Sequence, residues 1–169
     1  MPRRLLAFPC QRGGLEAFHA KRGRGGSVEG FDSISNSIIG AGLDVHRELG
    51  PGLFESVYEN CLAHELEQRG LGVERQKVLP VHYKGLCLSQ GFRLDLLVEG
   101  AVVVEIKSIE KLDRLHEAQL LSYLKLSGCS VGLLMNFNVP LLKRGIRRLV
   151  RNWHPKHEPS ALSNLPRFA

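Results

Sequence analysis

Two apolar segments that contain three charged residues constrain the fold of this chain most. Each segment has the composition of a buried strand. The segments are residues 92–98 and 102–107, and the charges are Asp95, Glu105 and Lys107. Strands inside a sheet seldom carry charged side chains unless these are paired or bind a metal ion. The segments are therefore expected to form a hairpin whose charges have a chemical role.

The length of the connection decides whether these charges share one face of the sheet. Glu105 and Lys107 are two residues apart in one strand, so both point to the same side. A three-residue loop, residues 99–101, brings Asp95 opposite Glu105, whereas a two-residue turn puts Glu105 on the other face. We therefore predict a three-residue loop or a bulge.

Two carboxylates that meet in this way favour a cation site. Held about 4 Å apart, they repel by roughly 4 kcal/mol at an effective dielectric constant near 20. A divalent cation converts that repulsion into binding, and oxygen ligands without sulfur or imidazole favour Mg²⁺ or Mn²⁺. An ordinary ion pair of Lys107 with Asp95 or Glu105 is the alternative that the pattern leaves open.

The rest of the chain predicts helices before and after a run of strands, an order that favours an α/β fold with a central mixed sheet flanked by helices. Apolar residues at helical spacing define the helices, and short apolar or alternating runs define the strands. Helices are expected over residues 33–49, 55–69, 113–127 and 140–150, and strands over residues 73–83, 86–88, 92–98, 102–106 and 131–137.

The net charge of +6 lies mainly at the ends of the chain. Residues 1–30 hold six basic and two acidic residues, whereas residues 31–150 hold fourteen of each. Charge alone therefore does not make the core a nucleic-acid-binding surface. The best local candidate for contacting phosphates is the outward face of the last predicted helix, and a solvated helix face is its alternative. That face consists of Lys143, Arg144, Arg147 and Arg148.

The predicted domain spans residues 31–152, between two tails. Residues 1–30 are rich in Gly and Arg and are expected to be a flexible basic tail. A basic arm that grips phosphates, or a true start near Val28, are the alternatives. Residues 153–169 are expected to be an irregular C-terminal tail.

The sequence contains no apolar run of about 18 residues, so no membrane-spanning helix is expected. The apolar stretch at the start ends too soon for a signal peptide. The four cysteines show neither C-x-x-C spacing nor a zinc pattern and are expected to be free thiols. Together these features predict a cytoplasmic protein.

Two further motifs contain residues suited to a polar site. Residues 52–58 read G-x-x-E-x-x-Y, which places Glu55 at a helix start, where the helix dipole favours a carboxylate. Gln119 and Tyr123 are four residues apart and share one face of a helix. The alternatives are an ordinary first-turn acid and a surface glutamine above a core tyrosine.

As a set, these residues resemble the GxxExxY family, a small branch of the PD-(D/E)XK nuclease-like superfamily. The resemblance runs from about residue 38 to residue 150. It rests on the segment 45–52, Glu55 with Tyr58, Arg93 with Asp95, the run Glu105-Ile106-Lys107, the segment 116–124 and the run Asn136-Phe137-Asn138.

The resemblance implies a restriction-endonuclease-like fold with a Mg²⁺ or Mn²⁺ site. By that analogy Asp95 and Glu105 are metal ligands, with the Ile106 carbonyl as a further ligand. Glu55 matches an acid that superfamily members bring from the first core helix and is expected as a further metal ligand. Glu59 lies one turn beyond Glu55 and is left open as an alternative.

The implied chemistry is hydrolysis of phosphodiester bonds in nucleic acid. Lys107 would orient or activate the attacking water, and Gln119 and Tyr123 would line the site. The alternative is a non-catalytic or partner-dependent module that keeps the fold and acts through nucleic acid or another protein. A small α/β protein whose strand charges are purely structural is a further alternative.

Overall fold

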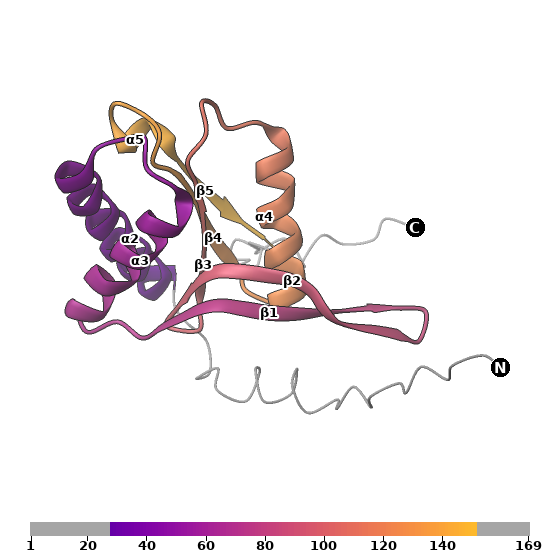
Figure 1. Cartoon of the computed structure of the whole chain (residues 1–169). Helices are drawn as coiled ribbons and strands as arrows, with labels where there is room; N and C mark the ends of the chain where they lie inside the picture. The colour runs from indigo at the N-terminus through magenta and orange to yellow at the C-terminus, as the bar shows by residue number, and fades with distance from the viewer. Residues whose placement is uncertain (1–27, 152–169) are drawn as a thin grey trace, which may run out of the picture.

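The computed structural model describes residues 28–151, which build a mixed five-stranded sheet with helices on both faces (Figure 1). The strands lie in the order β1-β2-β3-β4-β5. Neighbours are antiparallel except β3 and β4, which are parallel and connected through α4. The elements are α2 (Val28–Leu49), α3 (Glu55–Gln68), β1 (Val73–Tyr83), β2 (Leu86–Val98), β3 (Val102–Lys107), α4 (Arg114–Ser127), β4 (Val131–Asn136), α5 (Leu142–Gly145) and β5 (Ile146–Val150).

Different helices cover the two faces of the sheet. α2 and α3 lie together on one face, and α4 covers the other (Figure 1). The central strands β3 and β4 are buried at almost every residue, as expected for strands covered on both faces. The predicted α/β fold, a mixed sheet flanked by helices, is therefore confirmed.

Alternation along β3 divides its residues between the two helical layers. Val104 and Ile106 pack in the core cluster under α2 and α3, whereas Val103 packs in the cluster under α4 with Tyr123. Glu105 is two residues from Val103, so its side chain lies on the α4 side of the sheet. The charges that the sequence singled out therefore point to the face that α4 covers.

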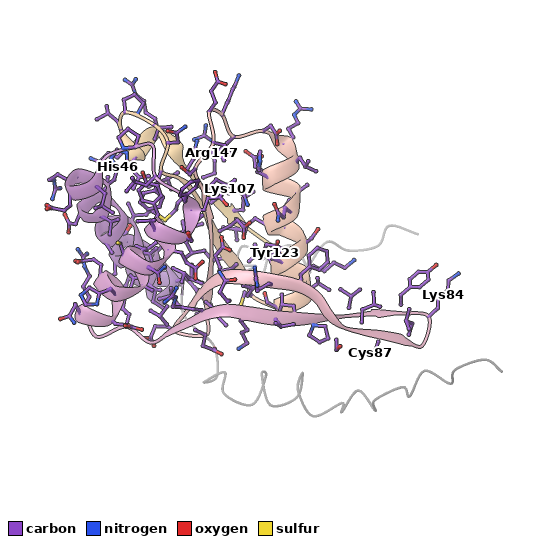
Figure 2. All side chains as sticks on the ribbon, viewed as in Figure 1. His46, Lys84, Cys87, Lys107, Tyr123 and Arg147 are labelled. Atoms are coloured by element: carbon purple, nitrogen blue, oxygen red, sulfur yellow. The ribbon has the colours of Figure 1, made fainter. Side chains whose placement is uncertain are left out.

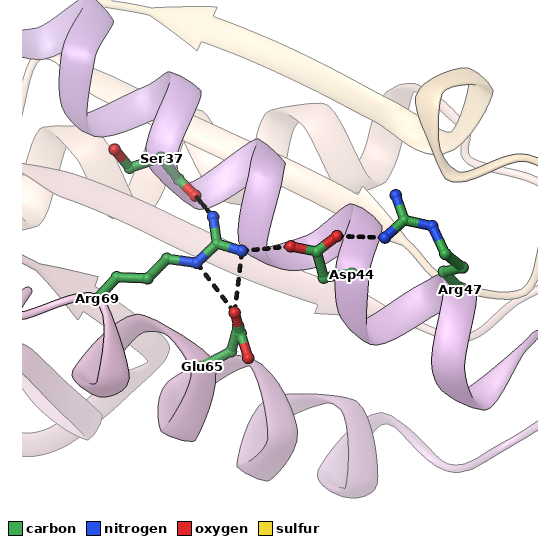
Figure 3. Close-up of polar contacts among 5 residues, drawn as sticks. All are labelled: Ser37, Asp44, Arg47, Glu65 and Arg69. Carbon is green, nitrogen blue, oxygen red and sulfur yellow. Dashed lines mark hydrogen bonds and ion pairs between the residues drawn. The ribbon is translucent and has the colours of Figure 1, made fainter.

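An arginine network ties α2 to α3 (Figure 3). Arg69, just after α3, forms ion pairs with Glu65 at 2.9 Å and with Asp44 of α2, and donates to the Ser37 carbonyl at 3.4 Å. Asp44 also accepts a hydrogen bond from Arg47. Each partly exposed pair contributes only about 0–1 kcal/mol, so the network mainly fixes how the two helices lie together.

The hairpin of β1 and β2 is longer than predicted. The separate strands expected over residues 86–88 and 92–98 are one strand, Leu86–Val98. Its outer half projects beyond the helices (Figure 1). The pairing shifts register between Leu79 and Val81, beside a proline that an edge strand tolerates because the outer N–H needs no partner.

The predicted final helix over residues 140–150 is wrong. Only Leu142–Gly145 is helical, and Ile146–Val150 is a strand that pairs with β4. The edge of β4 needs a partner for its backbone groups. Gly145 also lies so close to the Asn136 carbonyl oxygen that an added Cβ would be 2.3 Å away. Apolar spacing could not distinguish one helical turn plus a strand from one continuous helix.

The two predicted tails fall mostly on residues 1–27 and 152–169, which lie outside the described residues. The helix α2 begins at Val28, so residues 28–30, expected in the tail, are helical. The first helix therefore begins five residues before the predicted position. Phe31, in the added turn, packs against the core and accounts for the extension.

Within the described residues, no helix is long and apolar enough to span a bilayer. Cys61 and Cys129 are not disulfide-bonded, as expected. Cys87 is disulfide-bonded, so the expectation of free thiols is wrong for this residue.

Candidate active site

A three-residue loop connects β2 to β3, as the sequence predicts. Val98 pairs with Val102, which leaves residues 99–101 as the connection. The same register, followed away from the loop, brings Asp95 level with Glu105. The two carboxylates therefore point to one face of the sheet on neighbouring strands.

The Asp95 carboxylate is bound to the backbone of the neighbouring strand. Its Oδ2 accepts a hydrogen bond from Ile106 N at 2.8 Å. The last backbone pair of β2 and β3, counted away from the loop, is Leu96 with Val104. Beyond that pair, the Asp95 side chain replaces backbone hydrogen bonding as the link between the two strands. It fixes the Asp95 carboxylate beside Glu105.

The Glu105 side chain is almost completely buried, with 2% of the residue exposed. Its Oε1 accepts a hydrogen bond from Lys107 Nζ at 2.7 Å. Its Oε2 is buried and has no hydrogen-bond partner among the described residues. A buried carboxylate oxygen without a partner is costly, which favours a partner outside the described residues.

Burial and crowding of charge disfavour the ionised form of both carboxylates. Burial, followed by the charge of Asp95, raises the pKa of Glu105 from 4.5 to about 7, against the opposing hydrogen bond and charge of Lys107. Burial also raises the pKa of Asp95, partly offset by the hydrogen bond from Ile106. A cation between the two carboxylates would reverse both effects.

Lys107 is the cation of the site, and its side chain is 14% exposed. Burial lowers the pKa of Lys107, but the hydrogen bond to Glu105 and the charges of Glu105, Glu55 and Asp95 outweigh it and raise that pKa. Lys107 therefore keeps its proton at neutral pH. It can act through charge and hydrogen bonding but not as a base.

Glu55 begins α3 and contacts the residue that follows Lys107. Its Oε1 accepts a hydrogen bond from Ser108 N at 3.1 Å. Ser108 Oγ donates in turn to the Leu53 carbonyl at 2.5 Å. The start of α3 is thus joined to the end of β3, which brings Glu55 to the site.

Glu59, one turn beyond Glu55, has a different set of partners. Its carboxylate accepts hydrogen bonds from Arg75, at 3.2 and 3.3 Å, and from Gln76. Burial is the main cause of the raised pKa of Asp95, and the charges of Glu59 and Glu55 add to it. Of these two acids, Glu55 is the one beside the loop that leaves β3.

Tyr58, the tyrosine of the G-x-x-E-x-x-Y motif, has a structural role in the loop before α3. Its hydroxyl donates to the Gly50 carbonyl at 2.7 Å and accepts from Leu53 N at 3.1 Å. Its ring is fully buried and stacks on Phe137 at 4.5 Å. Tyr58 therefore holds in place the loop that leads into α3 and Glu55.

Asn136 holds the other side of the same region, and sequence reasoning assigned it no role. It is 1% exposed and stands opposite Lys107 in the parallel pairing of β3 and β4. Its side chain donates to the Ile109 carbonyl at 2.8 Å and accepts from Ile109 N at 3.1 Å. The signals in the sequence are an amide at the end of an apolar run and its place in the run Asn136-Phe137-Asn138.

Gln119 and Tyr123 lie on the face of α4 that covers the site. Gln119 Nε2 donates to the Tyr123 hydroxyl oxygen at 2.6 Å. Burial, followed by the charge of Glu105, raises the pKa of Tyr123. Figure 2 shows Tyr123 and Lys107 in the central part of the molecule, far from the hairpin end that Lys84 marks. The structure thus brings the sequence-predicted polar residues to one region.

The basic residues predicted to contact phosphates do not form one face, because the helix that would align them is absent. Arg147 and Arg148 are adjacent in β5, so their side chains point to opposite sides. Arg148 pairs with Asp32 of α2, and Arg147 donates to the carbonyls of Arg144 and Ile146. The prediction that one helix face presents these basic residues is therefore wrong. The residues of that prediction are Lys143, Arg144, Arg147 and Arg148.

Asp95 and Glu105 fit a hard divalent cation. Glu105 contributes an unpartnered buried oxygen, and both pKa values are raised in a way that a cation would relieve. Residues 28–151 contain no group of three or more His, Cys, Asp or Glu residues that could hold a metal ion. Glu55, whose Oε1 accepts a hydrogen bond from Ser108 N, does not complete such a group with Asp95 and Glu105 among the described residues.

A family model described as the PD-(D/E)XK nuclease superfamily matches residues 32–149. The chain belongs to this superfamily. The matched range covers the fold from α2 to β5 and every residue of the candidate site. The run Glu105-Ile106-Lys107 reads E-X-K, and Asp95 lies level with Glu105 on the neighbouring strand. Comparisons with curated proteins and with solved structures gave no match.

Proposed function

We propose that this protein is a cytoplasmic, Mg²⁺- or Mn²⁺-dependent nuclease that hydrolyses phosphodiester bonds in nucleic acid. The observation that carries the proposal is a buried Glu105 oxygen, beside Asp95 and Lys107, for which residues 28–151 supply no hydrogen-bond partner. In a member of a nuclease superfamily, such a pair supports a cation site next to a phosphate. The narrower assignment to the GxxExxY family remains a resemblance.

Asp95 and Glu105 would hold the cation, with the Ile106 carbonyl as a further ligand. When bound, the cation would stabilise charge on the phosphate and acidify a water molecule. Ile106 N–H already orients Asp95, and Lys107 orients Glu105. Little side-chain ordering is therefore needed on binding.

Lys107 and the helix α4 would contribute the remaining polar contacts. Lys107, which keeps its proton, would orient the attacking water and offset negative charge. The Tyr123 oxygen accepts a hydrogen bond from Gln119, so its own O–H is free to donate toward substrate. Glu55 would position Ser108 and the end of β3.

Thermal unfolding with and without Mg²⁺ or Mn²⁺ tests the cation site. Binding to the native state should stabilise the protein by about 2.7 kcal/mol at a hundredfold excess over Kd. Glu105→Ala should abolish this response, and Glu67→Ala, an exposed acid on α3, should keep it. A wild-type protein that does not respond to either metal would contradict the proposal.

Cleavage of labelled single- and double-stranded DNA and RNA tests the activity itself. Lys107→Gln should lower the rate about 100-fold or more, as loss of a positioned donor does elsewhere, while the metal still stabilises the variant. Wild-type cleavage that survives EDTA would contradict a metal-dependent mechanism.

One observation favours the alternative of a partner-dependent module. The hairpin of β1 and β2 exposes several large apolar side chains, a surface typical of protein contacts. Metal binding without cleavage by the isolated chain would favour this alternative. The exposed residues are Val78, Tyr83, Leu86, Leu88 and Phe92.

A further inference from the structure

Phe54 is an aromatic residue beside the candidate active site that the fold leaves in solvent. It is 82% exposed and directly precedes Glu55 at the start of α3. We propose that Phe54 is a stacking platform for a base of single-stranded nucleic acid. This inference rests on the proposed nuclease function and specifies its substrate class.

A pocket lies between Phe54 and the segment that follows β3. It has a volume of about 430 Å³ and adjoins the end of β3, because one lining residue, Ser108, directly follows Lys107. A base held here would therefore lie beside the end of β3, the strand that carries Glu105 and Lys107. The lining residues are Leu53, Phe54, Glu55, Ser56 and Ser108.

The backbone that carries the Phe54 ring is fixed on both sides. The preceding residue, Leu53, is bonded to the Tyr58 hydroxyl through its N–H and to Ser108 through its carbonyl. The Phe54 carbonyl accepts hydrogen bonds from Val57 N at 3.0 Å and Tyr58 N at 3.5 Å. A ring on an ordered backbone loses little conformational entropy when a ligand stacks on it.

The composition of the pocket favours a base over a phosphate. Glu55 would repel a phosphate, whereas its oxygens and the hydroxyl of Ser56 can accept hydrogen bonds from the N–H groups of a base. The face of a base also matches the exposed phenyl ring and the apolar Leu53. Stacking would add affinity to any phosphate contacts, which the predicted basic row on α5 and β5 does not supply as one helix face.

Stacking on Phe54 requires a base whose face is accessible. In a duplex, each base is stacked between its neighbours and must be unstacked before a protein ring can reach it. A single strand meets no such cost, and every base offers an aromatic face. The site should therefore prefer single strands with little dependence on sequence.

Binding in EDTA tests this inference without cleavage. Fluorescence anisotropy would follow a labelled 20-nucleotide oligothymidylate and a duplex of the same length on the full chain. Phe54→Ala should weaken single-strand binding roughly 5- to 150-fold, the range for loss of one stacked base, and Phe54→Trp should retain it. Leu86→Ala, which removes an exposed apolar side chain at the hairpin end, should bind like wild type.

Phe54→Trp adds a direct readout, because its new indole emission should be quenched when the oligonucleotide binds. Equal binding by Phe54→Ala and wild type, equal losses on single strand and duplex, or no wild-type binding to the single strand would each overturn the inference. If the expected binding pattern appears but no cleavage occurs with Mg²⁺, base stacking is supported and the proposed hydrolysis fails.

Discussion

At the scale of single residues, Glu105 carries an energetic cost that the fold alone does not repay. A valine at this position would be buried without desolvating a charge. Lys107 donates a hydrogen bond to one oxygen of the carboxylate, and the other has no partner in the part of the chain that the structure describes. The same arrangement leaves Glu105 able to respond to protons and cations near neutral pH.

Without metal, the free energy of unfolding is expected to fall as pH rises from about 4.5 to about 7. Because the pKa of Glu105 is raised to about 7 in the native state, that state binds more protons than the unfolded chain in this window. The full loss is roughly 3 kcal/mol, at about 1.36 kcal/mol per pKa unit. Urea unfolding in EDTA between pH 4 and pH 8 measures it.

Glu105→Gln is the matched variant for this pH dependence, since it keeps the shape of the side chain and removes the titrating proton. Its stability should fall less over the same window, and the remaining slope should come partly from Asp95, whose pKa burial also raises. A slope equal to that of wild type would show that Glu105 does not titrate as expected.

At the scale of elements, the site depends on two loops that buried side chains hold in place. Tyr58 binds the loop between α2 and α3, and Asn136 binds the segment after β3. Ser108 joins the two loops through Glu55 and Leu53. A substitution of Tyr58 or Asn136 should therefore alter the site although neither residue is one of its carboxylates.

Tyr58→Phe tests this coupling, because it deletes one hydroxyl and keeps the ring that stacks on Phe137. The free energy of unfolding should fall by about 1–3 kcal/mol, since Gly50 O and Leu53 N lose their partner. Nucleolytic turnover should also fall. Tyr83→Phe, at an exposed hairpin position, is the control and should change neither quantity.

Gly145→Ala tests the junction of α5 and β5. The added Cβ would lie 2.3 Å from the Asn136 carbonyl oxygen, so backbone must move, and we expect a loss of about 1–3 kcal/mol in chemical denaturation. Gly40→Ala, on α2, would approach only the movable end of the Arg69 side chain, at 3.0 Å. If the Gly145 variant were as stable as the Gly40 variant, the close packing of Gly145 against Asn136 would be contradicted.

At the scale of the whole molecule, β2 runs from an exposed hairpin end into the buried centre of the sheet. Leu86 is 55% exposed, whereas Leu97 is fully buried. Figure 1 shows the outer hairpin free of the helical layers. One strand therefore serves both as an accessible surface and as part of the core.

Two leucine substitutions on this strand should have opposite consequences for stability. Leu97→Ala should cost about 2–5 kcal/mol, the usual range for a buried leucine. Leu86→Ala should stay within about 0.5 kcal/mol of wild type, as exposed substitutions do. Thermal unfolding at one pH compares them, and a large loss in the Leu86 variant would mean that the hairpin end is buried, for example by a second copy.

Much of the fold followed from the sequence because its determinants are local. Loop length set the register that brings Asp95 level with Glu105, and apolar periodicity located α3 and α4. Which residues share a region was predicted on this basis. Their catalytic roles stay predictions.

What only the tertiary structure decided depends on partners distant in sequence. β5 replaced a helix because the edge of β4 required backbone partners. Glu55 contacts the segment after β3, whereas Glu59, one turn on, is bound by Arg75 and Gln76 of β1. The raised pKa of Glu105 arises mainly from burial, which exists only once α4 covers the sheet. The periodicity of apolar residues predicts which face of a helix or strand a residue occupies. Desolvation and the pairing of distant segments arise only in the assembled fold.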